Sequence, residues 1–224
     1  MRKIGIIGGM GPAATIDLLQ KIYRHDKVAS EQQHVQLLVN FDPSVVDRSW
    51  AVRNGQNAQL TAHLSSNAVG LVAQGASLLA IACNTAHVVL ADLQKSVDVP
   101  FVDMVEETVS FALANSSGPI GVMATDGTLE TGLYTLRLVA AGRRVVLPEP
   151  AEQRDLMDII YKVKEGHLDG RDRVLEIKHN LHRNGAELVI AACTELPLLM
   201  GSEQGMVDAN DILAQVLVRR ARAI

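Results

Sequence analysis

The sequence contains few cysteines and few aromatic side chains. Two of its 224 residues are cysteine, and aromatic residues make up 3% of the chain. A fold held together by disulfide bonds is therefore not expected. The buried surface must come from aliphatic side chains, which is typical of parallel sheets covered by helices on both faces.

Long apolar runs and a strong charge imbalance are missing as well. No run approaches the roughly 20 apolar residues that span a bilayer, and glycines interrupt the N-terminal stretch before a signal peptide could form. The net charge is only −4, and the arginines of "VRRARAI" at the C-terminus suit the last turn of a helix. We therefore expect a cytoplasmic protein that binds neither membranes nor nucleic acid.

Strand and helix patterns alternate along the whole chain, which predicts right-handed βαβ units and a largely parallel sheet. The expected strands are Lys3–Gly8, Val35–Asn40, Leu78–Ala82, Pro100–Asp103, Ile120–Ala124, Val145–Leu147 and Leu188–Ala192. The expected helices are Pro12–Lys27, Asn57–Gln74, Thr85–Lys95, Val105–Ala114, Leu129–Ala141, Glu152–Lys164, Arg171–Arg183 and Asp211–Arg222.

The two halves of the chain resemble each other. "GASLLAIAC" (75–83) matches "GAELVIAAC" (185–193), and "KIGIIGGMG" (3–11) matches "PIGVMATDG" (119–127) at a similar offset. Eight helices would also fit a barrel, but this repeat favours an internal duplication. We predict two pseudosymmetric, doubly wound (flavodoxin-like) α/β lobes with the active site in the cleft between them. Residues 1–115 and 208–224 form the first lobe and residues 116–207 the second.

The loop "GIIGGMGPAAT" lies between an expected strand and an expected helix. It fits the loose dinucleotide pattern G-x-G-x-x-A. Two features argue against a nucleotide: Pro12 has no N–H to offer a phosphate, and the expected acidic residue, Asp42, comes about eight positions late. Two explanations remain, a tight turn of the sheet or a loop whose backbone N–H groups, around Met10 and Gly11, bind a small anion.

Both cysteines end an apolar run: Cys83 in "SLLAIACNTAH" and Cys193 in "ELVIAACTEL". A single free cysteine is commonly a buried small hydrophobe. Two at equivalent ends of repeated strands favour a shared site, because doubly wound sheets bind ligands beyond the carboxyl ends of their strands. Cys83 and His87 also lie one helical turn apart, as zinc ligands can. The turn would have to aim both at one ion, however, so no metal is expected.

Two thiols that face one atom from opposite lobes suit inversion of a carbon stereocentre. One thiolate removes a proton, and the opposite thiol returns another to the far face. Polar side chains that could stabilise the carbanion fall in strand-to-helix loops at the same sheet edge. These are Asn84, Thr85, Thr125, Thr128 and Thr194.

The motifs "GGMGPAAT", "CNTAH" and "CTEL" resemble those of the cofactor-independent aspartate/glutamate racemases, and the opening motif is most similar to that of the aspartate racemases. The resemblance covers the whole chain. It implies that Cys83 and Cys193 are the catalytic bases, that no cofactor is needed, and that the protein is a homodimer. It also implies that Arg48 in "VVDRSW" and Lys164 in "IIYKVKEG" bind the side-chain carboxylate of a dicarboxylic amino acid.

Some features leave alternatives open. The family often has glycine where this chain has Ala192. Arylmalonate decarboxylases and maleate isomerases share the fold and reuse the cysteine positions, and the residues alone also allow a non-catalytic dicarboxylate-binding protein. Glutamate or several amino acids could replace aspartate as substrate. His87 and Glu195 are expected to support the site, as neighbours of the two cysteines.

Overall fold

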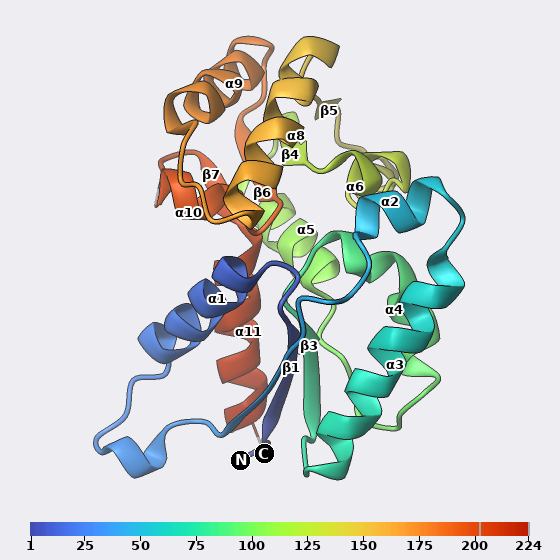
Figure 1. Ribbon diagram of the computed structural model, residues 1–224. Helices are drawn as coiled ribbons and strands as arrows, with labels where there is room; N and C mark the ends of the chain where they lie inside the picture. The colour runs from blue at the N-terminus through green and yellow to red at the C-terminus, as the bar shows by residue number, and fades with distance from the viewer. Residues whose placement is uncertain (202, 224) are drawn as a thin grey trace.

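The chain forms two α/β lobes, one above the other in Figure 1. The computed structural model describes residues 1–201 and 203–223. Positions 202 and 224, which fall in the segments expected to form the second and the first lobe, lie outside these residues. No helix within the described residues is both long enough and apolar enough to cross a membrane.

The first sheet has three parallel strands in the order β2-β1-β3: β1 (Ile4–Gly8), β2 (Leu37–Phe41) and β3 (Leu78–Ile81). Every residue of β1 and of β3 is buried. Both strands therefore read as continuous apolar runs, because helices cover them on two faces. Beyond β3, Phe101 forms a single parallel bridge with Leu79.

The second sheet has four parallel strands in the order β5-β4-β6-β7: β4 (Ile120–Ala124), β5 (Val145–Val146), β6 (Leu188–Ala192) and β7 (Met206–Asp208). In each sheet the first strand of its half lies between the second and the third. Both sheets therefore repeat the order of a doubly wound, flavodoxin-like sheet. The prediction of two pseudosymmetric parallel-sheet lobes is confirmed.

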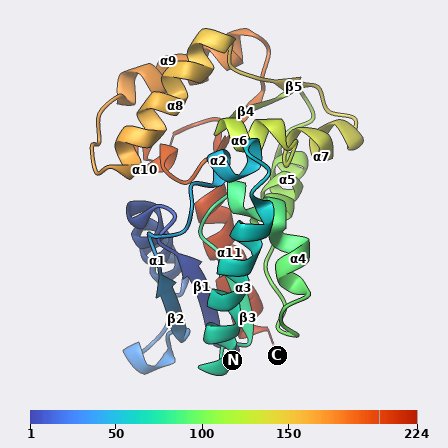
Figure 2. The ribbon, with the colours of Figure 1, turned by 45° about the vertical axis from the view of Figure 1, so that its right-hand side comes forward.

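Helices connect the strands and cover both sheets (Figures 1 and 2). α1 starts with Pro12, which suits a first turn because the N–H that proline lacks would have no partner there. The α-helices are α1 (Pro12–His25), α2 (Arg48–Arg53), α3 (Asn57–Ala73), α4 (Leu90–Gln94), α5 (Met104–Asn115), α6 (Asp126–Glu130), α7 (Thr135–Ala140), α8 (Pro150–Lys164), α9 (Arg171–Arg183), α10 (Leu196–Met200) and α11 (Ala209–Arg222). Two 3₁₀-helices are η1 (Glu31–Gln33) and η2 (Thr85–Val89).

Three buried apolar clusters hold the layers together. One lies between the sheets and joins α1, α5 and α11 to residues of β1, β3, β4 and β6. The second lies under α3 on the outer face of the first sheet, and the third under α8 and α9 on the outer face of the second. The last helix, α11, contacts both α1 and α5. The two sheets therefore share a continuous core that fixes the lobes on either side of the cleft.

Several expected elements are wrong in detail. Residues 100–103 form no strand beyond the bridge at Phe101, because Pro100 has no N–H for a ladder and Asp103 already caps α5. The expected helix 129–141 is two short helices, α6 and α7, separated by a turn in which Gly132 has a φ of 70°. A side chain at that φ would be strained. The expected helix 85–95 consists of η2 followed by α4.

Candidate active site

A small cavity lies between the two lobes, at the carboxyl ends of their strands. Both cysteines line it, one from each lobe, although their side chains are otherwise buried. The sheets bring them together because β3 and β6 occupy equivalent positions in the two strand orders. The residues that line the cavity are Met10, Arg48, Ser49, Cys83, Asn84, Thr85, Thr125, Lys164, Cys193, Thr194 and Glu195.

Equivalent contacts cross the cleft on its two sides. The loop after β3 reaches the start of α6, where the hydroxyl of Thr85 lies 2.8 Å from that of Thr125 and 2.9 Å from that of Thr128. The loop after β6 reaches the start of α1, where the Gly11 N–H donates to Glu195 Oε1 at 3.2 Å. Thr85 and Glu195 each stand two residues after a cysteine. The duplicated scaffold therefore places unlike groups beside its two sulfurs.

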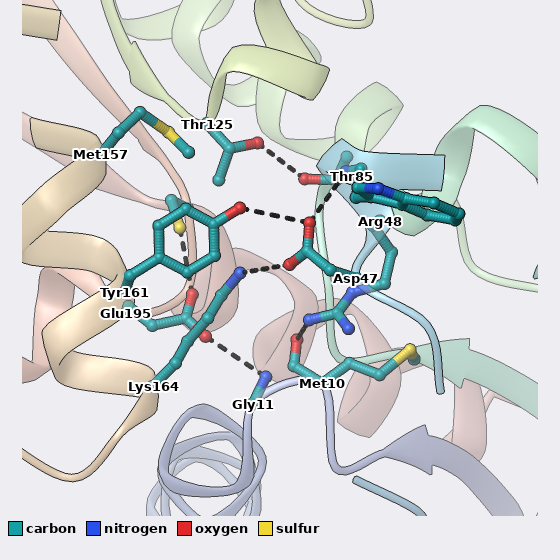
Figure 3. Close-up of polar contacts among 12 residues, drawn as sticks. Met10, Gly11, Asp47, Arg48, Thr85, Thr125, Met157, Tyr161, Lys164 and Glu195 are labelled. Carbon is teal, nitrogen blue, oxygen red and sulfur yellow. Dashed lines mark hydrogen bonds and ion pairs between the residues drawn. The ribbon is translucent and has the colours of Figure 1, made fainter. Parts of the chain in front are cut away.

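Cys193 is hydrogen-bonded to an acid. Its Sγ donates to Glu195 Oε2 at 3.0 Å, and the Thr194 hydroxyl donates to the same oxygen at 3.2 Å (Figure 3 draws Glu195 with the Gly11 N–H). Burial raises the pKa of the Cys193 thiol well above its usual range, and the Glu195 carboxylate raises it further. The Lys164 ammonium acts in the opposite direction without cancelling these effects. Cys193 is therefore a protonated thiol.

Arg48 begins α2, and its guanidinium is held by backbone oxygens. Nη1 donates to the carbonyls of residues 45 and 46 at 3.3 and 3.2 Å, and Nη2 donates to Met10 O at 3.2 Å (Figure 3). Its buried Nε has no hydrogen-bond partner among the described residues. Burial alone would lower the pKa of Arg48. The neighbouring groups, Cys83 first among them, have the larger effect and raise this pKa. This guanidinium remains charged and has a donor left for a ligand.

Lys164, at the end of α8, faces Arg48 from the second lobe. Its Nζ lies 3.4 Å from Asp47 Oδ2, and the Tyr161 hydroxyl donates to Asp47 Oδ1 at 3.2 Å (Figure 3). Burial works against the Lys164 charge, but the Glu195 carboxylate leads the neighbouring groups that outweigh it and raise the pKa of Lys164. Asp47 also caps α2 by accepting from the N–H of Trp50 at 2.9 Å. One carboxylate thus joins α2 of the first lobe to α8 of the second.

His87 lies behind Cys83 rather than in the cavity. Its Nδ1 bonds to the Cys83 carbonyl oxygen at 2.8 Å, and its Nε2 accepts from the Met104 N–H at 3.2 Å. Burial lowers the pKa of His87, so the ring is neutral. Both ring nitrogens are engaged, which leaves neither for a metal ion shared with Cys83. Within the described residues no group of three or more potential ligands forms a metal site.

Most of the predicted site residues meet at the cavity. Gly11, Thr128 and His87 do not line it, but each contacts a residue that does. Asp42, weighed as a ribose ligand, instead accepts from Ser44 and pairs with His63. Four residues of the site or its immediate support were not predicted from the sequence. These are Ser49, Asp47, Tyr161 and Tyr134, whose hydroxyl donates to Asn84 Oδ1. Of these, only Asp47 had a sequence signal, as an N-cap residue before Arg48.

Comparison with known proteins identifies the group to which this fold and cavity belong. A family model described as Asp/Glu/Hydantoin racemase matches residues 7–217. The chain belongs to this racemase family. The predicted resemblance is confirmed, and with it the membership of a family of isomerases.

Relatives within the family cover nearly the whole chain. A curated broad specificity amino-acid racemase, RacX of Bacillus subtilis (strain 168), is 25% identical over 96% of each chain. The solved aspartate racemase of Picrophilus torridus is 28% identical with a TM-score of 0.86, covering 98% of this chain and 94% of its own. The glutamate racemase of Aquifex pyrophilus shares the fold, at 23% identity and a TM-score of 0.66 over 97% of this chain and 83% of its own.

Proposed function

We propose that the protein is a cofactor-independent aspartate racemase in which Cys83 and Cys193 act as paired base and acid. The single observation that carries this proposal is the cavity that both sulfurs line from opposite lobes. Inversion at the α-carbon needs an acid/base group on each face of that carbon. Membership of the racemase family supports the same chemistry.

The surroundings of the sulfurs support a direction for the first proton transfer. Cys193 keeps its proton and donates a hydrogen bond to Glu195. Cys83 is then the base that takes the α-proton, and Cys193 delivers its own proton to the opposite face. The electron pair left by the C–H bond moves into the α-carboxylate, where buried donors stabilise it. Asn84 Nδ2 is such a donor, buried and without a partner among the described residues.

Aspartate is the proposed substrate because two cations face each other across a small cavity. Arg48 comes from the first lobe and Lys164 from the second, and both line the same small cavity. A carboxylate held between them in a buried site gains more than it would in water. One additional methylene would move the α-carbon off the line between the sulfurs. A shift of about 1 Å costs on the order of 100-fold in rate, so aspartate should be favoured over glutamate by about that factor.

Circular dichroism of L-aspartate, incubated with chelator-treated and reduced enzyme, tests the activity. We expect the signal to decay to zero and solvent deuterium to enter the α-carbon. Cys83→Ser and Cys193→Ser should each abolish racemisation while ligand binding remains. An unchanged signal with every amino acid tried, or near-full activity in either variant, would refute the two-cysteine proposal. A non-catalytic binding protein would bind aspartate without any deuterium exchange.

A second candidate, a racemase of broad specificity, is favoured by one contact. The Asp47 carboxylate already faces Lys164 at 3.4 Å, so this cation has a partner even without a substrate carboxylate. A neutral side chain could then be accepted in place of that of aspartate. The rates for aspartate, glutamate, asparagine and alanine decide between the two. A preference for aspartate of less than about tenfold over the neutral amino acids would favour the second candidate.

A further inference from the structure

Asn84 holds a donor towards the cavity while its acceptor is already engaged. It follows Cys83, is 2% exposed and lines the cavity. Its Oδ1 accepts a hydrogen bond from the Tyr134 hydroxyl, whereas its Nδ2 has no partner among the described residues. A buried N–H without a partner is costly, and this one lies where a ligand in the cavity could accept from it. The orientation of this amide therefore matters to whatever binds beside it.

Tyr134 comes from the opposite lobe, just before α7, and is 1% exposed. Burial raises the pKa of its hydroxyl, so the group remains a hydrogen-bond donor. Its counterpart in the repeated first half is Leu18, 116 positions earlier and in the same central core. The residues three positions later support this correspondence. Lys21 pairs with Asp208, which caps α11, and Arg137 pairs with Asp103, which caps α5.

The counterpart position in the first half, Leu18, is apolar, so the Tyr134 hydroxyl is present in the second half only. The residue that corresponds to Asn84 in the second half is Thr194, 110 positions later. Leu18 cannot donate a hydrogen bond to Thr194. An oriented amide donor is thus built on one side of the cleft, beside Cys83.

We propose that Tyr134 is a positioning residue that fixes the Asn84 amide, so that Nδ2 donates to the α-carboxylate of the amino-acid substrate. The inference rests on the proposed racemase function and adds a residue to its site. Without the Tyr134 hydroxyl the amide can rotate and turn its oxygen towards the substrate carboxylate. Two negative oxygen dipoles would then face each other, and the donor that stabilises the developing carbanion would be lost.

Tyr134→Phe keeps the ring and removes only the hydroxyl. We expect kcat/KM for the racemised amino acid to fall by about 10- to 100-fold, which is the loss typical of a hydrogen bond to a charged group. The calorimetric Kd for L-aspartate should rise, while the thermal midpoint stays close to that of the wild type. Thr108→Val is the matched control. It removes the other hydroxyl beside the Tyr134 oxygen but leaves Asn84 untouched, so kcat/KM should stay within about twofold.

A double-mutant cycle on kcat/KM distinguishes this positioning role from a purely structural one. In an Asn84→Ala background, Tyr134→Phe should cause no further loss of kcat/KM, because the amide that it orients is gone. Wild-type kcat/KM in Tyr134→Phe, or losses that multiply in the double variant, would overturn the inference. If Tyr134→Phe does not fold, Asn84→Asp replaces it, since it keeps an oxygen that accepts from Tyr134 and puts a negative oxygen where the donor was. A loss of at least the same size in Asn84→Asp would support the inference, and full activity would overturn it.

The two proposals fail in different ways. A wild-type protein that neither racemises nor exchanges the α-proton of any amino acid contradicts the racemase proposal. An active wild type whose Tyr134→Phe variant is equally active and binds L-aspartate equally well contradicts only the role of Tyr134.

Discussion

A side chain at Gly127 would press against residues of the opposite lobe. Gly127 lies in α6, and a Cβ at this position would come within 2.8 Å of Ser49 Cα and 3.1 Å of Thr85 Cγ2. Carbon atoms in contact normally lie about 3.5–4.0 Å apart. Gly127→Ala should therefore displace α2 by roughly 0.7 Å and the Cys83 loop by roughly 0.4 Å. Both carry residues that line the cavity, Arg48 and Ser49 on α2 and Thr85 on the loop.

The cost to activity follows from that displacement. A misplacement of about 1 Å can cost on the order of 100-fold in rate, so we expect Gly127→Ala to lower kcat/KM by roughly 10- to 100-fold. Stability should change less. Overpacking costs about 1–3 kcal/mol, and alanine in a helix recovers about 0.5–1 kcal/mol. Initial racemisation rates from both enantiomers and calorimetric unfolding measure the two effects separately.

Gly70→Ala is the matched control for this experiment. Gly70 is also a helical glycine, in α3, but within the described part of the chain nothing lies within 4 Å of its added Cβ. The change should stabilise the fold by about 0.5–1 kcal/mol and leave the rate unchanged. Wild-type kcat/KM in Gly127→Ala would show that the cleft tolerates the shift, and the reasoning from lobe spacing would then be wrong.

Two further predictions concern ionisable groups. Burial, and after it the Glu195 carboxylate, raises the pKa of Cys193, so Glu195→Gln should lower this pKa. In a variant without Cys83, iodoacetamide should then label Cys193 at lower pH than it does when Glu195 is intact. An unshifted pH profile of labelling would contradict this prediction. The Asp26 carboxylate, with no exposed side-chain surface, has a lowered pKa despite its burial, because it accepts from the Val35 N–H, Arg222 and His34. Its stabilising effect is therefore present above the unfolded-state pKa of about 3.9 and lost as the pH falls through the lower folded value. Asp26→Asn should cost about 3–5 kcal/mol at pH 7 in urea unfolding, and the cost should shrink as the pH falls below about 3.9 towards the folded value. A cost that does not fall with pH would contradict the assignment.

The sheets could be predicted from the sequence because buried parallel strands leave a strong signal. The runs that became β1, β3, β4 and β6 are apolar on both faces, and two of them end at the cysteines. Short elements leave no such signal. β7 has only three residues, and α10 is a single turn after Cys193. Their existence depends on neighbouring strands and helices rather than on local periodicity.

Site residues that stand at the end of a strand could be predicted from the sequence. Those that reach the site through contact between the two lobes could not. Cys83 and Cys193 stand at the ends of their own strands, so their place followed from topology. Tyr161 and Tyr134 enter the site only because α8 and α7 of the second lobe meet loops of the first. No pattern in a single sequence marks such contacts. Asp47 is an intermediate case, because its role as an N-cap was readable but its pairing across the cleft was not.

The duplicated fold explains why two thiols face one cavity, and its departures from symmetry explain how they can play different parts. A racemase with two catalytic thiols starts each turnover with one proton shared between them. In identical surroundings neither sulfur would be the preferred site of that proton. Here Glu195 accepts from Cys193, while its counterpart Thr85 bonds to hydroxyls of the opposite lobe. Under the proposed mechanism, a turnover that moves the proton to Cys83 leaves the enzyme in the less favoured of its two forms. Under the proposed mechanism, return to the starting form needs either the reverse reaction or exchange with solvent, and the acid beside Cys193 is the group placed to assist that exchange.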